Sequence, residues 1–510
     1  MRKATSNVLH SVTQRHWPLK IRTAKYSTPP LSKDTYKIKR GNFASLTDKD
    51  INVFEGIVGK TRMLTDVSDV EAYNVDWLHS VRGSSQCVLK PKTTEEVSAI
   101  LKHCNERRLA VCPQGGNTGL AGGSNPVFDE VVISTSLMNK IISFDSLSGV
   151  LTCQAGCVLE QLESYLLEQG FLMPLDLGAK GSCQIGGNVS TNAGGLRLVR
   201  YGSLHGTVLG IEAVLANGEV INCLNKMKKD NTGYHLKHLF IGSEGTLGLV
   251  TQVAIHCPVS PKSLNVAFLG LDSYEKVLEA LKSSKKDLGE ILSSCELMDR
   301  TSIQAVEENL KLRVPIKDCP FYMLIETSGS NSDHDEEKLS QFLENALEKN
   351  IIVDGIQASE PSRIKQLFEV RERMAEALLL DGFLYTYDVS LKPQDFYSIV
   401  PTTREHLKNV PGVMRVTGFG HFGDGNIHLN ITSKEYSKEI MNNIEPFVYE
   451  WTSKFGGSVS AEHGIGLKKT GAVHFCKPPQ AIQLMHQIKN VMDPNGIMNP
   501  YKVLPAINSA

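Results

Sequence analysis

The sequence predicts an α+β protein of more than one domain, and three observations support this. The chain has 510 residues, and a prior of roughly 150 residues per domain suggests about three domains. From about residue 46 to 262, short apolar runs alternate with clusters of glycine, which is typical of short strands joined by tight turns. From 263 onward, strand-like runs alternate with longer helical patterns, as in an antiparallel sheet with helices on one face.

The composition is that of an ordinary folded protein and argues against two kinds of partner. Lys+Arg 54 against Asp+Glu 55 gives a net charge of −1, whereas a general nucleic-acid binder needs a concentrated basic surface. No apolar run reaches about 18 residues, so a membrane-spanning helix is not expected. The 11 cysteines include no C-x-x-C pair, which predicts reduced thiols in a reducing compartment.

The N-terminal 40 residues differ from the rest of the chain. Residues 1–33 contain basic residues and many Ser and Thr but no acidic residue. This composition matches a mitochondrial transit segment, and a disordered basic arm is the alternative. In both interpretations residues 1–40 lie outside the fold.

Helix start and stop signals place the next elements. Thr93 and Glu96 have the spacing of a capping box, and an apolar stripe at helical period follows. A strand over 109–112 comes next. A second helix is expected over 158–169, with Gly170 ending it.

The second half of the chain predicts a regular alternation of elements. The acidic run 333–337 is interpreted as a solvated helix start rather than a site. Strands are expected near 264–270, 292–298, 320–327, 384–391 and 414–421, and helices near 273–283, 335–348, 362–380 and 437–455.

Four glycine-rich stretches, 113–124, 177–195, 201–206 and 242–250, point to a large anionic cofactor. The first follows a predicted strand directly. Glycine lets the backbone approach a ligand closely, and successive backbone N–H groups can form an anion site. No G-x-x-x-x-G-K-[ST] motif occurs. A loop-rich sheet with tight turns is the alternative.

One G-x-G-x-x-G motif, Gly418–Gly423, is not interpreted as a dinucleotide fingerprint. Such a fingerprint must open a helix, whereas residues 427–431 that follow here have the pattern of a strand.

Two histidines flank a glycine-rich turn in this region. A hairpin centred between Asp424 and Gly425 would place His421 directly opposite His428, with Cβ atoms about 4.5–5.5 Å apart. Two imidazoles at that spacing can share a cation. Asn430 would lie on the same face as His428.

A carboxylate for this site comes from further along the chain. Glu462 and His463 lie together in a glycine-bounded segment. Two histidines and one carboxylate leave coordination positions open, which is typical of catalytic metal sites. The alternative is a pair of cross-strand histidines and an unrelated Glu-His.

Arg371 interrupts the apolar stripe of the helix expected over 362–380. A cation within a buried stripe needs an anionic ligand or a carboxylate partner elsewhere in the protein. The sequence leaves open which of the two it has.

Together these motifs resemble the flavin-dependent D-2-hydroxyacid dehydrogenases with a vanillyl-alcohol-oxidase-type FAD fold. The resemblance implies a two-part FAD-binding domain over 46–262, an antiparallel-sheet substrate (cap) domain over 263–455 and a C-terminal segment over 456–510 that returns to the FAD domain. It covers residues 45–507 and rests on Pro113–Gly119, Gly186–Gly195, Gly418–His428, Ala461–Gly464 and Asn499–Lys502.

The resemblance implies FAD, with its pyrophosphate near 115–119. The loop 113–124 lacks the histidine that often attaches flavin in this superfamily, so we expect non-covalent FAD. The implied cofactor-binding residues are Pro113, Gly115, Gly116, Asn117, Thr118, Gly119, Gly181, Ser182, Gly187, Asn188, Thr191, Gly194, Gly195, Tyr201, Gly202, Glu244, Gly245, Gly248, Val250 and Asn499.

The resemblance also implies a reaction. Zn²⁺ would be held by His421, His428 and Glu462, with His463 as the base and Arg371 and Asn430 on the substrate. The implied reaction oxidises D-2-hydroxyglutarate to 2-oxoglutarate, with hydride passing from C2 to flavin N5. Electron-transfer flavoprotein in the mitochondrial matrix would accept the electrons.

Two departures from the family concern the far carboxylate of the substrate. A member of this family carries Thr at the position of Ala375 and Lys at that of Thr386, and Lys392 or Arg415 is the candidate to replace the missing cation. A D-lactate dehydrogenase of the same fold that uses cytochrome c therefore remains a second hypothesis. The metal-site residues taken alone would also suit a metal-dependent hydrolase without flavin, and the glycine-rich loops taken alone a non-catalytic FAD-binding protein.

Overall fold

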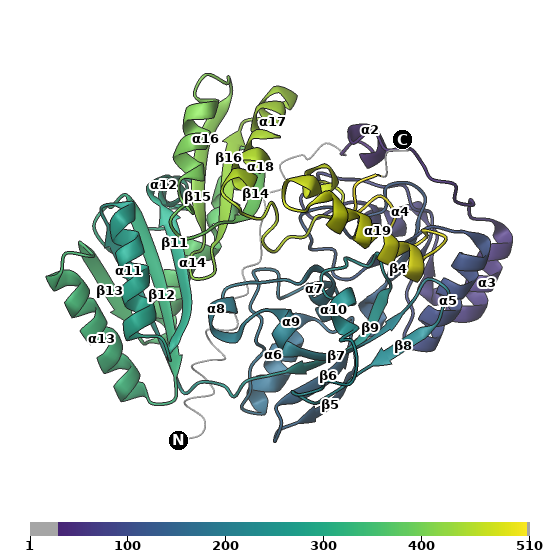
Figure 1. The fold of residues 1–510 in the computed structure, drawn as a ribbon, viewed down its shortest axis with the longest axis horizontal. Helices are drawn as coiled ribbons and strands as arrows, with labels where there is room; N and C mark the ends of the chain where they lie inside the picture. Colours follow the sequence, from purple (N-terminus) through teal and green to yellow (C-terminus); the bar gives the residue numbers. More distant parts are fainter. Residues whose placement is uncertain (1–28, 507–510) are drawn as a thin grey trace.

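Three β-sheets organise residues 29–506, the part of the chain that the structure, a computed structural model, describes (Figure 1). Residues 1–28, which hold most of the expected leader, lie outside the described residues. Residues 29–40 were expected to lie outside the fold, yet they contact it. Ser32 N donates to Arg82 O at 2.8 Å, and Arg40 pairs with Asp129 at 2.7 Å.

The first sheet is small and largely parallel, with the strand order β1-β2-β4-β3. Helices α3 and α5 bury their apolar faces against it, and the Thr93 side chain caps α5 as the sequence predicted. The elements of this region are α2 (Ser32–Thr35), α3 (Asp48–Val58), η1 (Lys60–Arg62), β1 (Met63–Leu64), α4 (Val67–Asn74), β2 (Val88–Leu89), α5 (Thr94–Arg107), β3 (Val111–Gln114), β4 (Val131–Ser134) and η2 (Thr135–Leu137).

The second sheet is antiparallel, with the order β5-β6-β9-β7-β8. The expected helix ending at Gly170 is present as α6, which packs on this sheet with α7. The elements are β5 (Ile141–Asp145), β6 (Val150–Gln154), α6 (Leu159–Glu168), α7 (Ile185–Thr191), α8 (Leu198–Tyr201), α9 (Leu204–Thr207), β7 (Val208–Val214), β8 (Val220–Cys223), α10 (Lys237–Phe240) and β9 (Leu249–His256).

The third sheet has seven antiparallel strands in the order β13-β10-β12-β11-β15-β16-β14. All five strands expected for the second half are present. The strands are β10 (Ser263–Leu271), β11 (Leu292–Asp299), β12 (Phe321–Gly329), β13 (Asp354–Ala358), β14 (Phe383–Ser390), β15 (Val413–His421) and β16 (Asn426–Ser433).

Helices cover both faces of this third sheet, not one face as expected. Strands β10 and β12 are buried along nearly their whole length, so each of their faces needs a cover. Helices α11, α13, α16, α17 and α18 pack on one face and α12, α14 and α15 on part of the other. The helices are α11 (Tyr274–Asp287), α12 (Arg300–Leu310), α13 (Ser332–Glu348), α14 (Pro361–Glu372), α15 (Met374–Leu379), α16 (Ile399–Leu407), α17 (Lys438–Ile444) and α18 (Phe447–Lys454).

Two expected helices are each divided. The helix over 437–455 breaks before Pro446, which has no N–H to donate and which forces Glu445 into an extended conformation. The helix over 362–380 breaks at Arg373, between α14 and α15.

The C-terminal chain passes from the third sheet back to the first. Ser458 pairs with Ser390 of β14, and Val111 of β3 donates to Ile497 O at 2.9 Å. This return carries η3 (Thr470–Phe475), which packs against α18, and α19 (Pro479–Met492), drawn in yellow near β4 in Figure 1. None of the helices within residues 29–506 has the length and apolarity needed to cross a bilayer.

Candidate active site

A glycine-lined cavity of about 860 Å³, counting the part open to solvent, lies between the first two sheets. At Gly116 a Cβ atom would lie 2.0 Å from Ser182 O, so only glycine permits this close approach. At Gly119 and Gly187 a Cβ atom would meet nothing within 4 Å. The cavity is therefore bounded by bare backbone, as an anionic ligand requires.

Most of the residues predicted to hold FAD line this cavity. They are Pro113, Gly115, Gly116, Asn117, Thr118, Gly119, Gly187, Asn188, Thr191, Glu244, Gly245, Gly248 and Val250. Wall residues that were not among the implied cofactor-binding residues are Gln114, Ala121, Gly123, Ser124, Thr135, Cys183, Gln184, Gly186, Ser190, Leu249 and His463, the last of which was predicted as the base.

The remaining predicted cofactor residues are not among those that line the cavity: Gly181, Ser182, Gly194, Gly195, Tyr201, Gly202 and Asn499. Asn499 connects two of the loops that form the wall. Its Nδ2 donates to Gly123 O at 2.9 Å and to Glu244 O at 2.7 Å. The C-terminal segment thus fixes the spacing of the cavity walls.

A second site lies on the face of the third sheet that α12, α14 and α15 cover only in part. Cross-strand pairs bring Thr386 opposite Asn430, and Asp388 opposite His428. Glu296 on β11 lies opposite His421 on β15. Side chains of alternate residues share a face, so these groups form neighbouring rows on one surface.

Three imidazoles surround one carboxylate oxygen in this site. Glu462 Oε1 lies 3.7 Å from His421 Nε2, 3.8 Å from His428 Nε2 and 3.8 Å from His463 Nε2. Glu462 Oε2 accepts a hydrogen bond from Gly195 N at 2.9 Å. The residues predicted from the sequence as ligands and base are therefore brought together.

The hairpin that carries the two strand histidines has a different register from the one expected. His421 pairs with Asn426 and His428 with Phe419, so the centre lies between residues 423 and 424, one residue earlier than predicted. The reason is a four-residue loop over 422–425, in which Gly425 takes φ +85°. His421 and His428 are therefore diagonal neighbours on one face, with ring centroids 5.4 Å apart.

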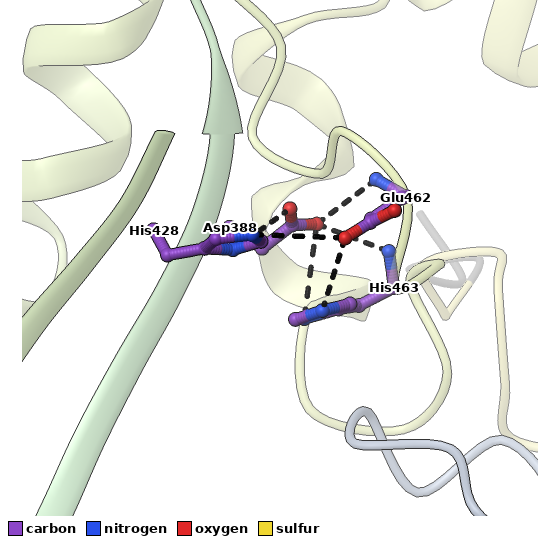
Figure 2. Close-up of side chains that lie close together, drawn as sticks. All are labelled: Asp388, His428, Glu462 and His463. Atoms are coloured by element: carbon purple, nitrogen blue, oxygen red, sulfur yellow. Dashed lines mark hydrogen bonds and ion pairs between the residues drawn. The ribbon is translucent and has the colours of Figure 1, made fainter. Parts of the chain in front are cut away.

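Two buried carboxylates that sequence reasoning missed hold the site in place. Glu296 Oε1 lies 2.9 Å from His421 Nδ1. Asp388 Oδ2 accepts backbone hydrogen bonds from residues 461, 462 and 463, each at 3.0 Å, and Oδ1 accepts from Asn426 at 2.8 Å. Figure 2 shows Asp388 beside His428, Glu462 and His463. A carboxylate within a predicted strand is the sequence signal that could have drawn attention to both residues, although not to their partners.

Burial and the neighbouring charges shift the pKa values of the cluster residues in different directions. Burial lowers the pKa of His428 to about 3, so its ring is neutral. Burial also opposes protonation of His421, but Glu296 and Glu462 together raise its pKa well above the usual value. Burial likewise opposes ionisation of Glu462, yet His421 and His463 lower its pKa to about 2.

Arg371 pairs with a carboxylate in the protein, one of the two arrangements that the sequence left open. Its Nε and Nη2 atoms lie 2.8 Å from Glu296 Oε2, and its guanidinium stacks over Phe419 at 4.9 Å. A substrate contact of Arg371 stays a prediction. Ala375 is exposed and Thr386 half-buried.

Arg415 and Lys392, the candidates to replace the missing family residue, do not both suit the binding of the substrate's far carboxylate. Arg415 pairs with Asp381 at 2.9 Å and also with Glu308. Lys392 is exposed. Around Thr386, Asn430 and Thr417 the described residues thus form an uncharged polar row.

His463 belongs to both sites. It lines the glycine-rich cavity, and its imidazole also faces Glu462 and Asp388. The cavity and the histidine cluster are therefore two halves of one site.

Comparison with known proteins agrees with this arrangement. A family profile described as the C-terminal domain of FAD linked oxidases matches residues 260–503, and a profile described as an FAD binding domain matches residues 85–224. The solved structure of p-cresol methylhydroxylase with substrate bound has a TM-score of 0.73 at 15% identity, covering 91% of this chain and 99% of that chain. This likeness shows a vanillyl-alcohol-oxidase-type fold.

Two relatives indicate the branch of the family. A mitochondrial D-2-hydroxyglutarate dehydrogenase of Danio rerio is 57% identical over 463 residues, 91% of this chain and 86% of the relative. A mitochondrial protein of Schizosaccharomyces pombe, named only provisionally as a D-lactate dehydrogenase, is 49% identical over 493 residues, 93% of this chain and 94% of the relative. The chain belongs to the FAD-linked oxidase family, among the mitochondrial flavin-dependent D-2-hydroxyacid dehydrogenases.

Proposed function

We propose that this protein oxidises D-2-hydroxyglutarate to 2-oxoglutarate, with non-covalent FAD in the glycine-lined cavity and Zn²⁺ held by His421, His428 and Glu462. The observation that carries the proposal is the place of His463, which borders the cavity and lies 3.8 Å from Glu462. A base in this position can reach the hydroxyl of a substrate whose C2 faces the flavin. The substrate assignment follows the Danio rerio relative.

The cavity suits FAD by the chemistry of its wall. Asn188 Oδ1 is buried there with no hydrogen-bond partner within residues 29–506, as expected of a group that bonds to a ligand. Gly119 and Gly187 offer backbone without side chains to the open space. When bound, FAD would supply the redox chemistry by accepting hydride at N5.

The histidine cluster suits Zn²⁺ by its donor set and its spacing. In a tetrahedral site with metal–ligand distances of about 2.0–2.2 Å, two ligand atoms lie about 3.3–3.6 Å apart. Glu462 Oε1 lies 3.7 Å from His421 Nε2 and 3.8 Å from His428 Nε2, so it would need to move only slightly toward each imidazole. Glu296 occupies Nδ1 of His421 and leaves Nε2 toward Glu462. When bound, Zn²⁺ would acidify the substrate hydroxyl as a Lewis acid.

A second ligand set is geometrically close. Atoms of Asp388, His428, Glu462 and His463 lie within 4.8 Å of one another. We favour the first set because Asp388 already accepts hydrogen bonds on both carboxylate oxygens. His463 then stays free to take the hydroxyl proton, with Asp388 3.8 Å from its Nδ1.

The far end of the substrate is where a second candidate function arises. D-2-Hydroxyglutarate has a second carboxylate, whereas the row formed by Thr386, Asn430 and Thr417 carries no charge. A D-lactate dehydrogenase of the same fold, passing electrons to cytochrome c, needs no charge there. If the substrate is D-2-hydroxyglutarate, we infer that electron-transfer flavoprotein in the mitochondrial matrix accepts the electrons.

The deciding experiment is an anaerobic titration of the zinc-loaded flavoprotein with D-2-hydroxyglutarate, followed by the flavin absorbance. We expect rapid bleaching that a chelator abolishes and added Zn²⁺ restores. Bleaching by D-lactate and not by D-2-hydroxyglutarate would establish the second candidate. A coloured protein that neither substrate bleaches would overturn both.

A further inference from the structure

A buried arginine from the FAD-binding part reaches the third sheet beside the histidine cluster. Arg197 Nε and Nη2 donate to the two carboxylate oxygens of Glu326 on β12, at 2.9 and 3.2 Å. Arg197 Nη1 also lies 3.4 Å from Asp176 Oδ2. None of the three side chains is more than 7% exposed, so this clamp joins the two halves of the molecule out of reach of solvent.

The segment that carries Arg197 also holds Glu462. The Gly195 N–H donates to Glu462 Oε2 at 2.9 Å. A Cβ atom on Gly194 would lie 3.0 Å from the same oxygen. Because Gly195 is two residues from Arg197, the clamp fixes the place of this amide and hence the direction in which Glu462 Oε1 points.

The segment is held on its other side as well. Leu196 N donates to Asp176 O at 3.2 Å, and a Cβ atom on Gly195 would lie 2.3 Å from that oxygen. Glu326 in turn accepts from Ser293 Oγ on β11 at 2.8 Å. Strand β11 is also the strand that carries Glu296, the partner of His421, so one patch of the sheet supports both an imidazole and a carboxylate of the cluster.

We propose that Arg197 is a positioning residue for Glu462 and thereby sets the metal affinity of the site. The inference rests on the proposed function, because it requires Glu462 to be a ligand. Within the described residues, the hydrogen bonds and ion pairs of the Arg197 side chain are to Glu326 and Asp176, neither of which belongs to the cluster or the cavity wall. It acts through Gly195, whose amide keeps Glu462 Oε2 engaged and leaves Oε1 to the histidines.

The test measures Zn²⁺ affinity of the holoenzyme by competition with a chromophoric chelator. We expect Arg197→Met to weaken Zn²⁺ binding by about 10- to 100-fold while the FAD content stays that of the wild type. Arg197→Lys should give an intermediate affinity, because an ammonium cannot reproduce the two-pronged bond to Glu326. The matched control is Arg200→Met, whose guanidinium contacts Glu290 O at the surface and whose loss should leave the affinity unchanged.

A Zn²⁺ affinity in R197M equal to that of the wild type overturns the inference alone, even if the variant is less stable. A wild-type protein that binds no Zn²⁺ overturns the proposed function with it. If R197M does not fold, the double variant Arg197→Met, Glu326→Met removes the buried carboxylate together with its arginine, a change that proteins often tolerate. A weakened affinity in that variant supports positioning, and a wild-type affinity overturns it.

Discussion

At the scale of single residues, Glu296 fixes the orientation of the His421 imidazole in the cluster. Its carboxylate lies between His421 Nδ1 at 2.9 Å and the guanidinium of Arg371 at 2.8 Å. A carboxylate on the far nitrogen of a ligating histidine fixes the tautomer and raises the basicity of the ligand. We expect Glu296→Gln to weaken Zn²⁺ binding about 10- to 100-fold, measured by chelator competition. Glu405→Gln, on an exposed helix turn, is the control and should have no effect. An unchanged affinity in E296Q would remove Glu296 from the metal site.

His463 carries the proposed proton transfer. It is the only side chain of the described cavity wall that also belongs to the histidine cluster. We expect His463→Ala to slow flavin reduction by about 10²- to 10⁴-fold, since that is the usual contribution of a general base. Stopped-flow absorbance measures the rate, and metal analysis of the same sample separates the two ligand sets. Zn²⁺ retained by H463A agrees with a base, whereas Zn²⁺ lost from it would make His463 a ligand. His486→Ala on α19 is the matched control.

Which of these residues could be predicted from the sequence depends on the kind of segment in which each one lies. His421 and His428 flank a glycine-rich turn, and Glu462 and His463 lie in a glycine-bounded segment, where polar side chains indicate a site rather than a core. Glu296 and Asp388 are carboxylates within strands, and their role depends on which strands become neighbours. No local pattern contains that information.

At the scale of elements, the register of the β15–β16 hairpin was likewise not contained in a local sequence pattern. The alternation of apolar residues predicted both strands, but the register depends on the loop. The four-residue loop moved the centre of the hairpin by one residue and hence the partner of His421 by two, from His428 to Asn426. The two histidines still share a face, because both arrangements keep them on the same side of the sheet. The prediction that the two histidines lie together was therefore correct, although the predicted pairing was wrong.

One element-scale contact gives a pH-dependent prediction. Asp50, 1% exposed in α3, accepts hydrogen bonds from Thr47 N at 3.0 Å and from Arg107 Nε at 2.9 Å, and it lies 2.9 Å from His103 Nε2. It thus caps its own helix and ties it to α5. Burial opposes ionisation, but the hydrogen bonds from Arg107, Thr47 and His103 hold the pKa of Asp50 well below its usual range.

Because this folded-state pKa lies below the unfolded value of about 3.9, the stabilisation is complete above that pH. It is lost as the pH falls through the folded-state pKa. We expect Asp50→Asn to lower the free energy of unfolding by about 2 kcal/mol at neutral pH. Urea unfolding of both proteins followed by circular dichroism should show the difference narrowing below about pH 4. The exposed Asp48→Asn is the control. A difference that stays constant across this range would show that the charge of Asp50 does not stabilise the fold.

At the scale of the whole molecule, the sequence predicted two structured halves but not how they meet. The seven-stranded order begins with β13 and ends with β14, which follow one another in the chain yet lie at opposite edges of the sheet. Residues 461–466 pass between the halves. This segment has too few apolar residues to predict an element. Its conformation follows from hydrogen bonds to Asp388 on one side and to Glu244 on the other.

That segment should couple the binding of the two ligands. Its first part supplies Glu462 and His463 to the metal cluster. Two residues later, Ile465 N and Gly466 N donate to Glu244, which lines the FAD cavity, at 2.7 and 2.8 Å. A ligand that orders one end leaves less ordering for the other ligand to induce.

We therefore expect Zn²⁺ to raise FAD affinity, and FAD to raise Zn²⁺ affinity by the same factor, about fivefold or more, because such coupling is reciprocal. Fluorescence titration of FAD into the deflavinated protein, with and without Zn²⁺, measures one direction, and calorimetry with Zn²⁺ measures the other. Without Zn²⁺, His421→Ala should bind FAD with the affinity of the wild type. With Zn²⁺ it should not show the increase in FAD affinity, because His421 contacts the cluster but does not line the cavity. Equal FAD affinities with and without Zn²⁺ in the wild type would mean that residues 461–466 are already ordered before either ligand binds, and that the two halves of the site assemble independently.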